Sequence, residues 1–410
     1  MIVGKYLLMS GLVALLIVKG ILPSFSSIGT DFANYYTSSY VMVHERENIG
    51  KLYDSQWFSE RAKQLGGPGG SVFQPFPPST ALLFAPLTKL GMRDAKDLWN
   101  VINLAILVAL VIVLGNMGGA SYGDAMLLVL ASGFALINNF YLGQVYLLMT
   151  LLLALSVWLA TKDLEVLSGI AAGLFIPIKY FPLCLVVAFL LEKRWVAAVS
   201  AILTAFCVVC LSLVLLGSEL HRIFLDHVLL NHLDGAMANP FSATYQSWNA
   251  LLRSLFVKDA AANPVPLIEW AGGFPLFRGL LLLALTSILI WILRNGLKAK
   301  PGISFIVGAL FSFVLLIAPA TATYHFLVLS IPMALLSSEW SKPNQIIPQL
   351  TLLVLYVGIG AVPSGAYDSL NLAGAWKILA YPRLFLLLGY FLTFALMIRS
   401  EQWHAQSSRI

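Results

Sequence analysis

Long apolar stretches separated by shorter polar segments recur along the whole chain. A stretch of about 17–22 apolar residues can cross about 30 Å of hydrocarbon as a helix, and lipid accepts only backbone that satisfies its own hydrogen bonds. The pattern therefore predicts an all-α integral membrane protein, a polytopic bundle of about 11–13 transmembrane helices. The expected spans are residues 6–23, 97–115, 125–141, 145–160, 166–179, 181–192, 195–216, 276–294, 303–318, 325–338, 346–362 and 384–399.

The stretches 166–179 and 181–192 are shorter than the others, and Lys179-Tyr180-Phe181-Pro182 lies at their junction. Proline removes a helical hydrogen-bond donor and so ends or bends a helix. We expect two half-helices or a kinked pair in this region.

Lysine and arginine in short loops indicate the cytoplasmic side of a membrane protein. The first apolar stretch follows Lys5 and lacks a small-x-small cleavage site, so we expect a retained first helix with its N-terminus inside. This topology places both termini in the cytoplasm and leaves the short outer loops, 139–145 and 319–324, without lysine or arginine. The cations expected in the cytoplasm are Lys5, Lys162, Lys193, Arg194, Arg294, Lys298, Lys300, Lys342, Arg399 and Arg409.

Two long segments then fall on the outer side of the membrane, a first outer loop at 24–96 and a second at 217–275. Within them, stretches 33–47 and 219–233 have the apolar–polar mixture of helices that lie on a membrane surface. We expect one transmembrane domain over residues 1–410, with juxtamembrane helices on its outer side.

The overall composition is that of a membrane protein. Of the 410 residues, 59% are hydrophobic and 11% are charged, whereas a soluble domain carries about 25% charged residues. The net charge of +6 comes from basic residues scattered at helix ends. This distribution indicates membrane topology and contact with membrane lipids rather than a nucleic-acid partner.

The cysteines and histidines do not form a metal-binding pattern. Cys207 and Cys210 lie inside an apolar stretch with no second pair nearby, where cysteine packs as a small hydrophobic residue. The spacings between His221, His227 and His232 do not place three imidazoles on one helical face. We predict no metal site and no cofactor, and the sequence leaves dependence on a divalent metal open.

Asp31 lies just outside the first predicted helix, at the water–lipid boundary. A carboxylate there can deprotonate a hydroxyl of a lipid-borne substrate, and it can equally cap a helix N-terminus. The outer turn around Gly143 and Gln144 offers amides that fit hydrogen bonds to sugar hydroxyls or simply a tight turn.

Two further residues suit a phosphate group. Lys179 stands between two apolar segments, where a charge costs about 2.5–3.5 kcal/mol at the bilayer centre on insertion scales. It is placed to meet a phosphate near the outer surface, although a lysine can also snorkel to the interface. His325, beside Tyr324 at the outer entrance of a span, can donate to a phosphate oxygen, move a proton or bond a helix end.

The second outer loop is dense in amides, hydroxyls and aromatic rings over residues 239–249, a stretch that includes Gln246 and Trp248 and is followed by Arg253. Such a surface is typical of carbohydrate binding, where aromatic faces stack on sugar C–H groups.

The candidate residues come from distant places in the sequence, yet the predicted topology puts all of them on the outer side. Structural polar residues would be shared between both faces of a membrane protein. The agreement therefore favours one outer site, built from Asp31, Gln144, Lys179, Gln246 and His325.

Several short motifs follow one another along the chain, namely Asp31-Phe32 with Tyr35-Tyr36, Leu52-Tyr53-Asp54, Phe76-Pro77-Pro78 with Ala85-Pro86-Leu87, Leu142-Gly143-Gln144-Val145, Lys179-Tyr180-Phe181-Pro182, Gln246-Ser247 with Arg253, and Tyr324-His325 with Pro332. Their order resembles glycosyltransferase family 87, polyprenyl-phosphate-mannose-dependent mannosyltransferases related to the actinobacterial enzymes that extend phosphatidylinositol mannosides. The resemblance covers about residues 25–335. Two positions depart from the family pattern: Phe76 stands where the family has tyrosine, and Tyr146 where it has asparagine. The first change removes a hydroxyl, and the second bears on the choice of sugar.

The resemblance implies a GT-C fold, in which outer loops of a helical bundle form the active site. It implies an inverting transfer of a hexose from a polyprenyl-phosphate donor to a lipid or glycan acceptor at the outer face of the cytoplasmic membrane. The acidic residue of the first outer loop acts as the base in such enzymes, which maps onto Asp31. The cations expected to meet the donor phosphate are Lys179, His325 and Arg253. The residues expected to contact sugar or acceptor are Tyr35, Tyr36, Gln144, Gln246, Trp248 and Tyr324.

Two other functions fit parts of the pattern. A transporter or flippase could use the broken pair near Pro182 as discontinuous helices, although the sequence shows no inverted repeat. A non-catalytic assembly subunit with the same fold would be indicated by loss of acidic residues from the first outer loop, where Asp31 is present.

Overall fold

The computed structural model describes residues 2–118, 121–235, 239–299, 302–337, 346–363, 365, 367 and 372–407. Over these residues the regular structure is helical, and the strand-like pairing is an isolated bridge between Asp259 and Asn263. The prediction of an all-α protein is confirmed. Three cations predicted to be cytoplasmic lie outside the described residues, namely Lys300, Lys342 and Arg409.

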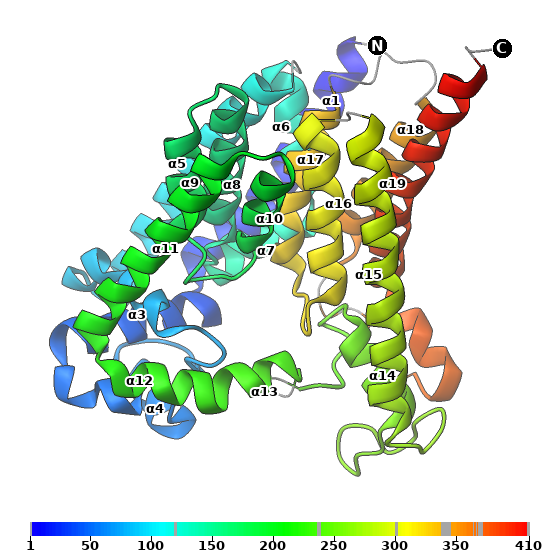
Figure 1. The fold of residues 1–410 in the computed structure, drawn as a ribbon. Coiled ribbons are helices and arrows are strands. Elements are labelled where there is room, and N and C mark those ends of the chain that lie inside the picture. Colours follow the sequence, from blue (N-terminus) through cyan, green and yellow to red (C-terminus); the bar gives the residue numbers. More distant parts are fainter. Residues whose placement is uncertain are drawn as a thin grey trace. The chain divides into compact units, whose positions relative to one another are not determined.

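The helices group into two compact units (Figure 1). Unit 1 consists of Met1–Val113 and Leu136–Leu233, and unit 2 of Leu114–Ala135 and Asp234–Ile410. The expectation of one transmembrane domain over residues 1–410 stays a prediction.

Unit 1 contains the first outer loop and the surface segment that follows α11. Its elements are α1 (Ile2–Leu16), η1 (Ile17–Ile21), α2 (Leu22–Ser26), α3 (Thr30–His44), η2 (Arg46–Lys51), α4 (Ser55–Gln64), η3 (Pro78–Leu82), η4 (Ala85–Lys89), α5 (Met92–Met117), α7 (Phe134–Leu142), α8 (Tyr146–Thr161), α9 (Glu165–Gly173), α10 (Leu183–Leu191), α11 (Trp195–Leu216), α12 (Ser218–Ile223), η5 (Phe224–Leu229) and α13 (Leu230–Leu233). The last turn of α5 and the first two residues of α7 belong to unit 2.

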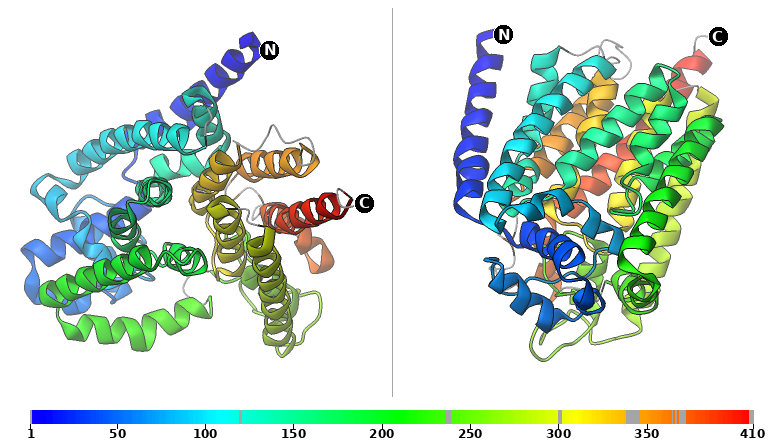
Figure 2. Two further views of the ribbon diagram at one scale, coloured as in Figure 1. Left: turned by 45° about the horizontal axis from the view of Figure 1, so that its top comes forward. Right: turned by 90° about the vertical axis from the view of Figure 1, so that its left-hand side faces the viewer.

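Helix α8 separates two polar ends of unit 1. Its 16 residues rise by about 24 Å. Tyr146 at its start lies beside Lys179, and the turn after its end contains Asp163, which pairs with Arg194 at 3.2 Å. Helices α3, α4 and α12 lie together at the end of α11 remote from Arg194 (Figures 1 and 2). Within unit 1, the segments predicted to be outside therefore gather at one end, and the predicted cytoplasmic turns at the other.

The region around Lys179 forms the predicted pair of half-helices. Helices α9 and α10 have nine residues each, so each rises by only about 13 Å and neither crosses a bilayer by itself. Residues 174–182 connect them as a series of turns that carries Lys179.

Both outer stretches predicted to be surface helices are helical, but they differ in burial. Residues 218–233 form α12, η5 and α13, with Leu225, Leu230 and Leu233 exposed. By contrast, α3 is buried along most of its length, because the turns η3 and η4 of the first outer loop pack against it. That residues 33–47 and 219–233 lie on the membrane surface stays a prediction.

Unit 2 contains the second outer loop and the C-terminal helices. Its elements are α6 (Tyr122–Ala131), α14 (Trp248–Phe256), α15 (Gly273–Ala299), α16 (Gly302–Ile317), η6 (Thr323–Leu329), α17 (Ser330–Leu336), α18 (Ile346–Ala361), η10 (Gly374–Ala380) and α19 (Pro382–Ser407). In Figure 1, α14 and the loop that follows it lie at one end of α15.

Four helical stretches are long and apolar enough to cross a membrane, and each coincides with a predicted span. They are Val3–Ser26, Met92–Met117, Trp195–Leu216 and Gly273–Leu297. Two bent pairs, Tyr122–Ala131 with Phe134–Leu142 and Gly374–Ala380 with Pro382–Ile398, raise the number to six if each pair is one span. The other predicted spans form shorter helices. Helix length and composition therefore support fewer membrane spans than the sequence predicted. Turns that the sequence pattern does not show interrupt the two bent pairs and separate α9 from α10, whereas α8, α16 and α18 are uninterrupted helices of 16 residues each.

The outward face of α11 shows what surrounds these helices. Val214, Phe206 and Leu203 have exposed fractions of 81%, 63% and 58%. A continuous apolar face of this kind is unstable in water and stable against lipid. The chain is therefore a multi-pass membrane protein.

Two glycines let α9 and α11 pack with their backbones in contact. A Cβ on Gly173 would lie 2.4 Å from the Ala201 carbonyl oxygen, and one on Gly169 would lie 2.3 Å from that of Ala197. Small residues at such crossings let transmembrane helices approach closely.

We predict that Gly173→Val separates α9 from α11 and destabilises the protein by about 1–3 kcal/mol, the usual range for overpacking. Thermal unfolding of the purified protein in detergent measures the effect. Gly11→Val is the matched control, because a Cβ at Gly11 meets nothing within 4 Å. Equal unfolding temperatures for the two variants would contradict the close packing.

Candidate functional site

Asp31 lies in the first turn of α3, at the positive end of the helix dipole. The residue at the N-cap is Gly29, with φ of 76°, and no side chain caps the helix. A Cβ at Gly29 would lie 2.6 Å from the Leu142 carbonyl oxygen, so glycine is needed where α3 meets the turn after α7. Gly29, and not Asp31, therefore occupies the N-cap position of α3. The half-buried Asp31 carboxylate lies in the first turn of the helix instead.

The Gln144 side-chain amide has a defined orientation next to Asp31. The Tyr35 hydroxyl donates to Gln144 Oε1 over 2.6 Å, and the Gln144 backbone N–H donates to the Asn139 carbonyl over 2.9 Å. Because Oε1 faces Tyr35, the Nε2 end faces the other way, and the amide lies close enough to Asp31 to lower the pKa of that carboxyl. Nε2 is buried and has no partner with full hydrogen-bond geometry among the described atoms.

Lys179 projects into a cage of three aromatic rings. Its Nζ lies 4.2 Å from the ring centroid of Phe76, 5.4 Å from that of Tyr146 and 5.6 Å from that of Tyr35. Ring faces attract an ammonium without using its N–H donors. Lys179 makes no hydrogen bond or ion pair with another described residue in the structure, so its donors are available to a ligand. Both positions that depart from the family pattern, Phe76 and Tyr146, are walls of this cage.

Burial and charge act on the ionisation of both groups, which lie outside the candidate spans. Burial raises the pKa of Asp31, while Gln144 and the charge of Lys179 act in the opposite direction. Burial lowers the pKa of Lys179 to about 7, while the charge of Asp31 opposes this shift. Opposite shifts of this kind in neighbouring groups are typical of sites that move protons or bind ions.

His232 in α13 is a neighbour of this pair that the sequence did not indicate. Burial, together with the charge of Lys179, lowers the pKa of His232 to about 4, so its imidazole is neutral near pH 7. The spacing of the histidines carried no signal for this placement, because it depends on how the surface segment packs beside the 174–182 connection.

A buried polar face of α5 holds the turn that carries Gln144. Lys96 Nζ donates to the Phe140 carbonyl over 2.9 Å and to Asn100 Oδ1 over 2.8 Å. Trp99 Nε1 donates to the Gly143 carbonyl over 3.2 Å. Lys96 is fully buried. Nothing in the sequence indicated this, because a lysine next to a predicted span normally marks the membrane boundary.

Asparagines extend this network to the neighbouring helices. Asn100 Nδ2 donates to the Ser24 carbonyl over 3.0 Å, and Asn139 Nδ2 donates to Asn103 Oδ1 over 3.3 Å. Asn139 Oδ1 accepts from the Leu147 N–H over 3.0 Å at the start of α8. The position of Gln144 is therefore tied to the end of α2, to α5 and to α8.

The two predicted tyrosines of α3 have different surroundings. Tyr35 is fully buried, and it forms part of both the Gln144 contact and the Lys179 cage. Tyr36 is 2% exposed, and its hydroxyl donates to the Leu90 carbonyl over 2.6 Å. Tyr36 thus stabilises the first outer loop in this structure, and its role in sugar binding stays a prediction.

The remaining predicted site residues belong to unit 2. They are Gln246, Trp248, Arg253, Tyr324 and His325. The structure thus brings Asp31, Tyr35, Gln144 and Lys179 together within unit 1 and shows the other five in their own unit.

Arg253 is paired within the protein. Its guanidinium donates to Asp234 Oδ2 over 2.7 Å and to the Asp234 carbonyl over 2.8 Å. Arg278 also pairs with Asp234, at 3.2 Å, and Phe274 lies under the Arg253 guanidinium at 4.3 Å. A phosphate that binds Arg253 has to compete with this carboxylate, and the predicted role stays untested.

Gln246 is a structural hub in unit 2. Its Nε2 donates to the Ala243 and Ala380 carbonyls over 2.6 and 2.8 Å, and its Oε1 accepts from the Arg383 backbone N–H over 3.0 Å. The side chain is 2% exposed, so these contacts use its hydrogen-bonding groups. The neighbouring Trp248 packs edge-on against a ring of α19, with its indole N–H buried and without a partner among the described atoms.

Arg383 positions the segment that carries Tyr324 and His325. Its guanidinium is buried and donates to Thr323 Oγ1 over 3.2 Å and to the Ile359 carbonyl over 3.3 Å. Tyr324 and His325 are half-buried, with ring centroids 5.0 Å apart. Arg383 was not among the residues predicted from the sequence. The signal that could have indicated it is the one that indicated Lys179, a cation at the edge of an apolar stretch.

Within the part of the chain that the structure describes, no three histidine, cysteine or acidic side chains come together as a potential metal site. His221 instead contacts the Gly217 carbonyl and the Ser212 hydroxyl, at 2.8 and 3.1 Å. Metal dependence stays untested.

Comparison with known proteins adds a family to this geometry. The model of glycosyltransferase family 87 matches residues 73–319. The match includes Gln144 and Lys179, and Asp31 precedes it.

Two curated relatives carry the same printed name, polyprenol-phosphate-mannose-dependent alpha-(1-2)-phosphatidylinositol pentamannoside mannosyltransferase. The one from Mycolicibacterium smegmatis is 28% identical over 258 residues, which is 61% of this chain and 58% of the relative. The one from Mycobacterium tuberculosis is 26% identical over 260 residues, 61% of this chain and 55% of the relative. The chain thus spans a little over half the length of the curated relatives that it matches.

We predict that Lys96→Met lowers stability by about 1–3 kcal/mol, because it leaves Asn100 Oδ1 without its donor and removes one of the two hydrogen bonds to the Phe140 carbonyl. Thermal unfolding in detergent measures the loss. Lys89→Met, at an exposed position, is the control. If both variants unfold at the wild-type temperature, the buried network does not hold the Gln144 turn.

Proposed function

The chain belongs to glycosyltransferase family 87, and from this membership and the geometry of Asp31 and Lys179 we propose that it transfers a hexose, mannose, from a polyprenyl-phosphate donor to a glycolipid acceptor. The named activity of the two relatives supports the donor class and a glycolipid acceptor.

One observation carries the proposal: a half-buried carboxylate and an unpaired ammonium lie within electrostatic range of each other in the same unit. Glycosyl transfer to a hydroxyl needs a base for the acceptor and a positive charge for the leaving phosphate. Asp31 and Lys179 supply these two groups.

The reaction is a single displacement. Asp31 accepts the proton of the acceptor hydroxyl while that oxygen forms a bond to the anomeric carbon. The bond between the anomeric carbon and the phosphate oxygen breaks, and the polyprenyl phosphate leaves with the electron pair. Lys179 offsets the charge that develops on this oxygen, and attack from the opposite face inverts the anomeric configuration.

The contributions of unit 2 belong to the same proposal. The roles of His325 at the donor phosphate and of Tyr324 at the sugar remain those predicted from the sequence. Arg253 takes part if the phosphate displaces the Asp234 carboxylate. Trp248 offers an indole N–H that has no partner among the described atoms.

We place the reaction at the outer face of the cytoplasmic membrane, with both chain termini in the cytoplasm. Support comes from unit 1, where Asp31 and Lys179 lie at the end opposite Arg194 and its neighbouring lysines. Short loops rich in lysine and arginine face the cytoplasm.

The alternative function, transport or flipping of a lipid-linked substrate, has no support from the names of the relatives, which describe transferases. The half-helices α9 and α10 are the feature that it would use.

We predict that Asp31→Asn lowers the rate of sugar transfer by about 10²–10⁴-fold, the usual contribution of a general base. The assay follows labelled mannose from its polyprenyl-phosphate donor into an extracted glycolipid acceptor. Asp226→Asn, an exposed change in the second outer loop, should leave the rate unchanged. Turnover near wild type in the Asp31 variant would exclude this residue as the base.

We predict a bell-shaped dependence of kcat/KM on pH. The base form of Asp31 is lost as the pH falls through its raised pKa, and the charge of Lys179 is lost as the pH rises through about 7. Lys179→Arg should remove the alkaline limb, since arginine stays protonated up to about pH 12. An unchanged alkaline limb in this variant would mean that another group titrates there.

A further inference from the structure

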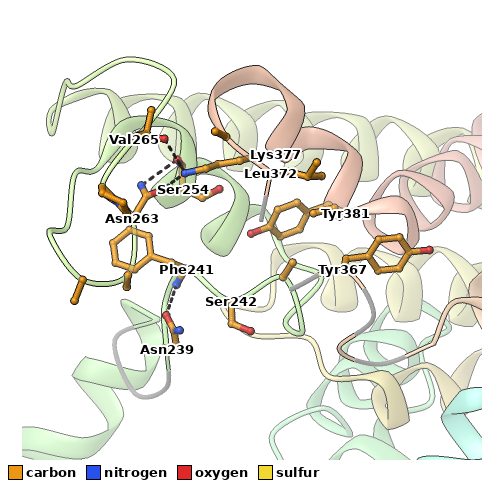
Figure 3. Close-up of a pocket in the computed structure, with 16 residues that line it drawn as sticks. Asn239, Phe241, Ser242, Ser254, Asn263, Val265, Tyr367, Leu372, Lys377 and Tyr381 are labelled. Carbon is orange, nitrogen blue, oxygen red and sulfur yellow. Dashed lines mark hydrogen bonds between the residues drawn. The ribbon is translucent and has the colours of Figure 1, made fainter. Parts of the chain in front are cut away.

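Unit 2 contains a cavity of about 550 Å³ that none of the predicted site residues lines (Figure 3). Its volume falls in the range of small-molecule sites, about 300–1,000 Å³. It lies between the second outer loop and the segment that leads into α19. The lining residues that matter for recognition are Asn239, Phe241, Ser242, Tyr367, Lys377 and Tyr381.

The walls of this cavity combine aromatic rings with neutral polar groups. In Figure 3, Phe241 and Tyr381 stand on opposite sides, with Lys377 at the top and Ser242 at the bottom. The Phe241 and Tyr367 side chains are half-buried, so part of each ring can be reached from the cavity. Asn239 is exposed, and its Oδ1 accepts from the Phe241 N–H over 3.0 Å. This hydrogen bond does not use the side-chain N–H groups of Asn239, which can donate to a ligand.

Hydrogen bonds within the protein brace the rim of the cavity. Asp259 Oδ1 accepts from the N–H groups of Ala261 and Ala262 over 3.0 and 2.7 Å and so shapes the loop at the rim. Lys377 bonds this loop through Asn263 Oδ1 and through the Val265 carbonyl at 3.0 Å. A preformed site binds with little loss of conformational freedom.

Within the part of the lining that the structure describes, no charged group is available to an anionic or metal ligand. A lysine ammonium has three donors, and those of Lys377 are directed at Asn263, Val265 and, at 3.4 Å, the Ser254 carbonyl. No carboxylate is present among the described lining residues. A phosphate would find no free cation here, and a divalent metal would find no anionic ligand.

The remaining chemistry fits a neutral carbohydrate. A sugar ring has apolar C–H faces that pack on aromatic rings and a rim of hydroxyls that pair with amides and hydroxyls. A lipid chain would instead place apolar methylenes against the side-chain amide of Asn239, which is unfavourable.

We propose that this cavity binds a neutral oligosaccharide, the glycan of the acceptor glycolipid. The assignment of the glycan to the acceptor rests on the proposed function, whereas binding of a neutral sugar rests on the cavity alone.

The first test measures binding of α-1,2-mannobiose to the purified full chain by saturation-transfer NMR. Wild-type protein should show transfer to the sugar ring protons. Phe241→Ala removes an aromatic wall and should raise the apparent Kd by about tenfold. Ala262→Trp fills the rim of the cavity from an exposed position, so it removes no packed side chain. It should weaken mannobiose binding as strongly as Phe241→Ala. Trp376→Ala, an exposed aromatic residue outside the lining, is the matched control and should bind like wild type.

The second test measures sugar transfer by the same variants. Phe241→Ala and Ala262→Trp should raise KM for the acceptor by about tenfold, with kcat and the donor KM unchanged. If the wild type binds mannobiose through Phe241 but transfers no sugar, the proposed function fails and the cavity assignment stands. If the wild type transfers sugar while both variants keep wild-type mannobiose binding and acceptor KM, the cavity assignment is overturned.

Discussion

The Gln144 amide is the constraint on which the geometry of unit 1 depends. An amide side chain has one accepting and one donating end, so the hydrogen bond from Tyr35 to Oε1 determines that the donor faces the opposite direction. That direction is the side of Asp31, whose charged form the amide favours. Lys96 in turn holds the turn before Gln144 through the Phe140 carbonyl. The buried hydrogen bonds of Lys96 and Asn139 therefore fix the turn that places Gln144 next to Asp31.

The aromatic cage explains how a lysine stays without an ion pair in this position. Ring faces stabilise the ammonium of Lys179 without occupying its N–H donors, so the hydrogen-bonding capacity of the charged form remains for a ligand. The two walls that distinguish this chain from the family pattern, Phe76 and Tyr146, therefore act on the cation. A tyrosine hydroxyl or an asparagine amide in these places would offer additional polar contacts near Lys179.

In unit 2, the polar residues of the second outer loop have different roles. Gln246 and Arg383 join backbone carbonyls from several elements, and Asp234 neutralises Arg253 and Arg278. The groups left for a neutral ligand line a separate cavity of the same loop around Phe241. Residue type alone cannot separate these uses, because hydrogen bonds within the protein and hydrogen bonds to a sugar require the same groups.

The sequence by itself determined the all-α membrane fold and the half-helices on either side of Lys179, and it indicated Asp31 and Lys179 as candidates whose catalytic roles stay predictions. These features are encoded locally, in apolar length, in a proline and in charges beside apolar stretches. The tertiary structure alone decided the orientation of Gln144, the burial of α3 and the neighbours of each charge, including His232 beside Lys179 and Asp234 beside Arg253. A side chain's ionisation and hydrogen bonds depend on groups that are remote in sequence, and only packing brings those groups within range.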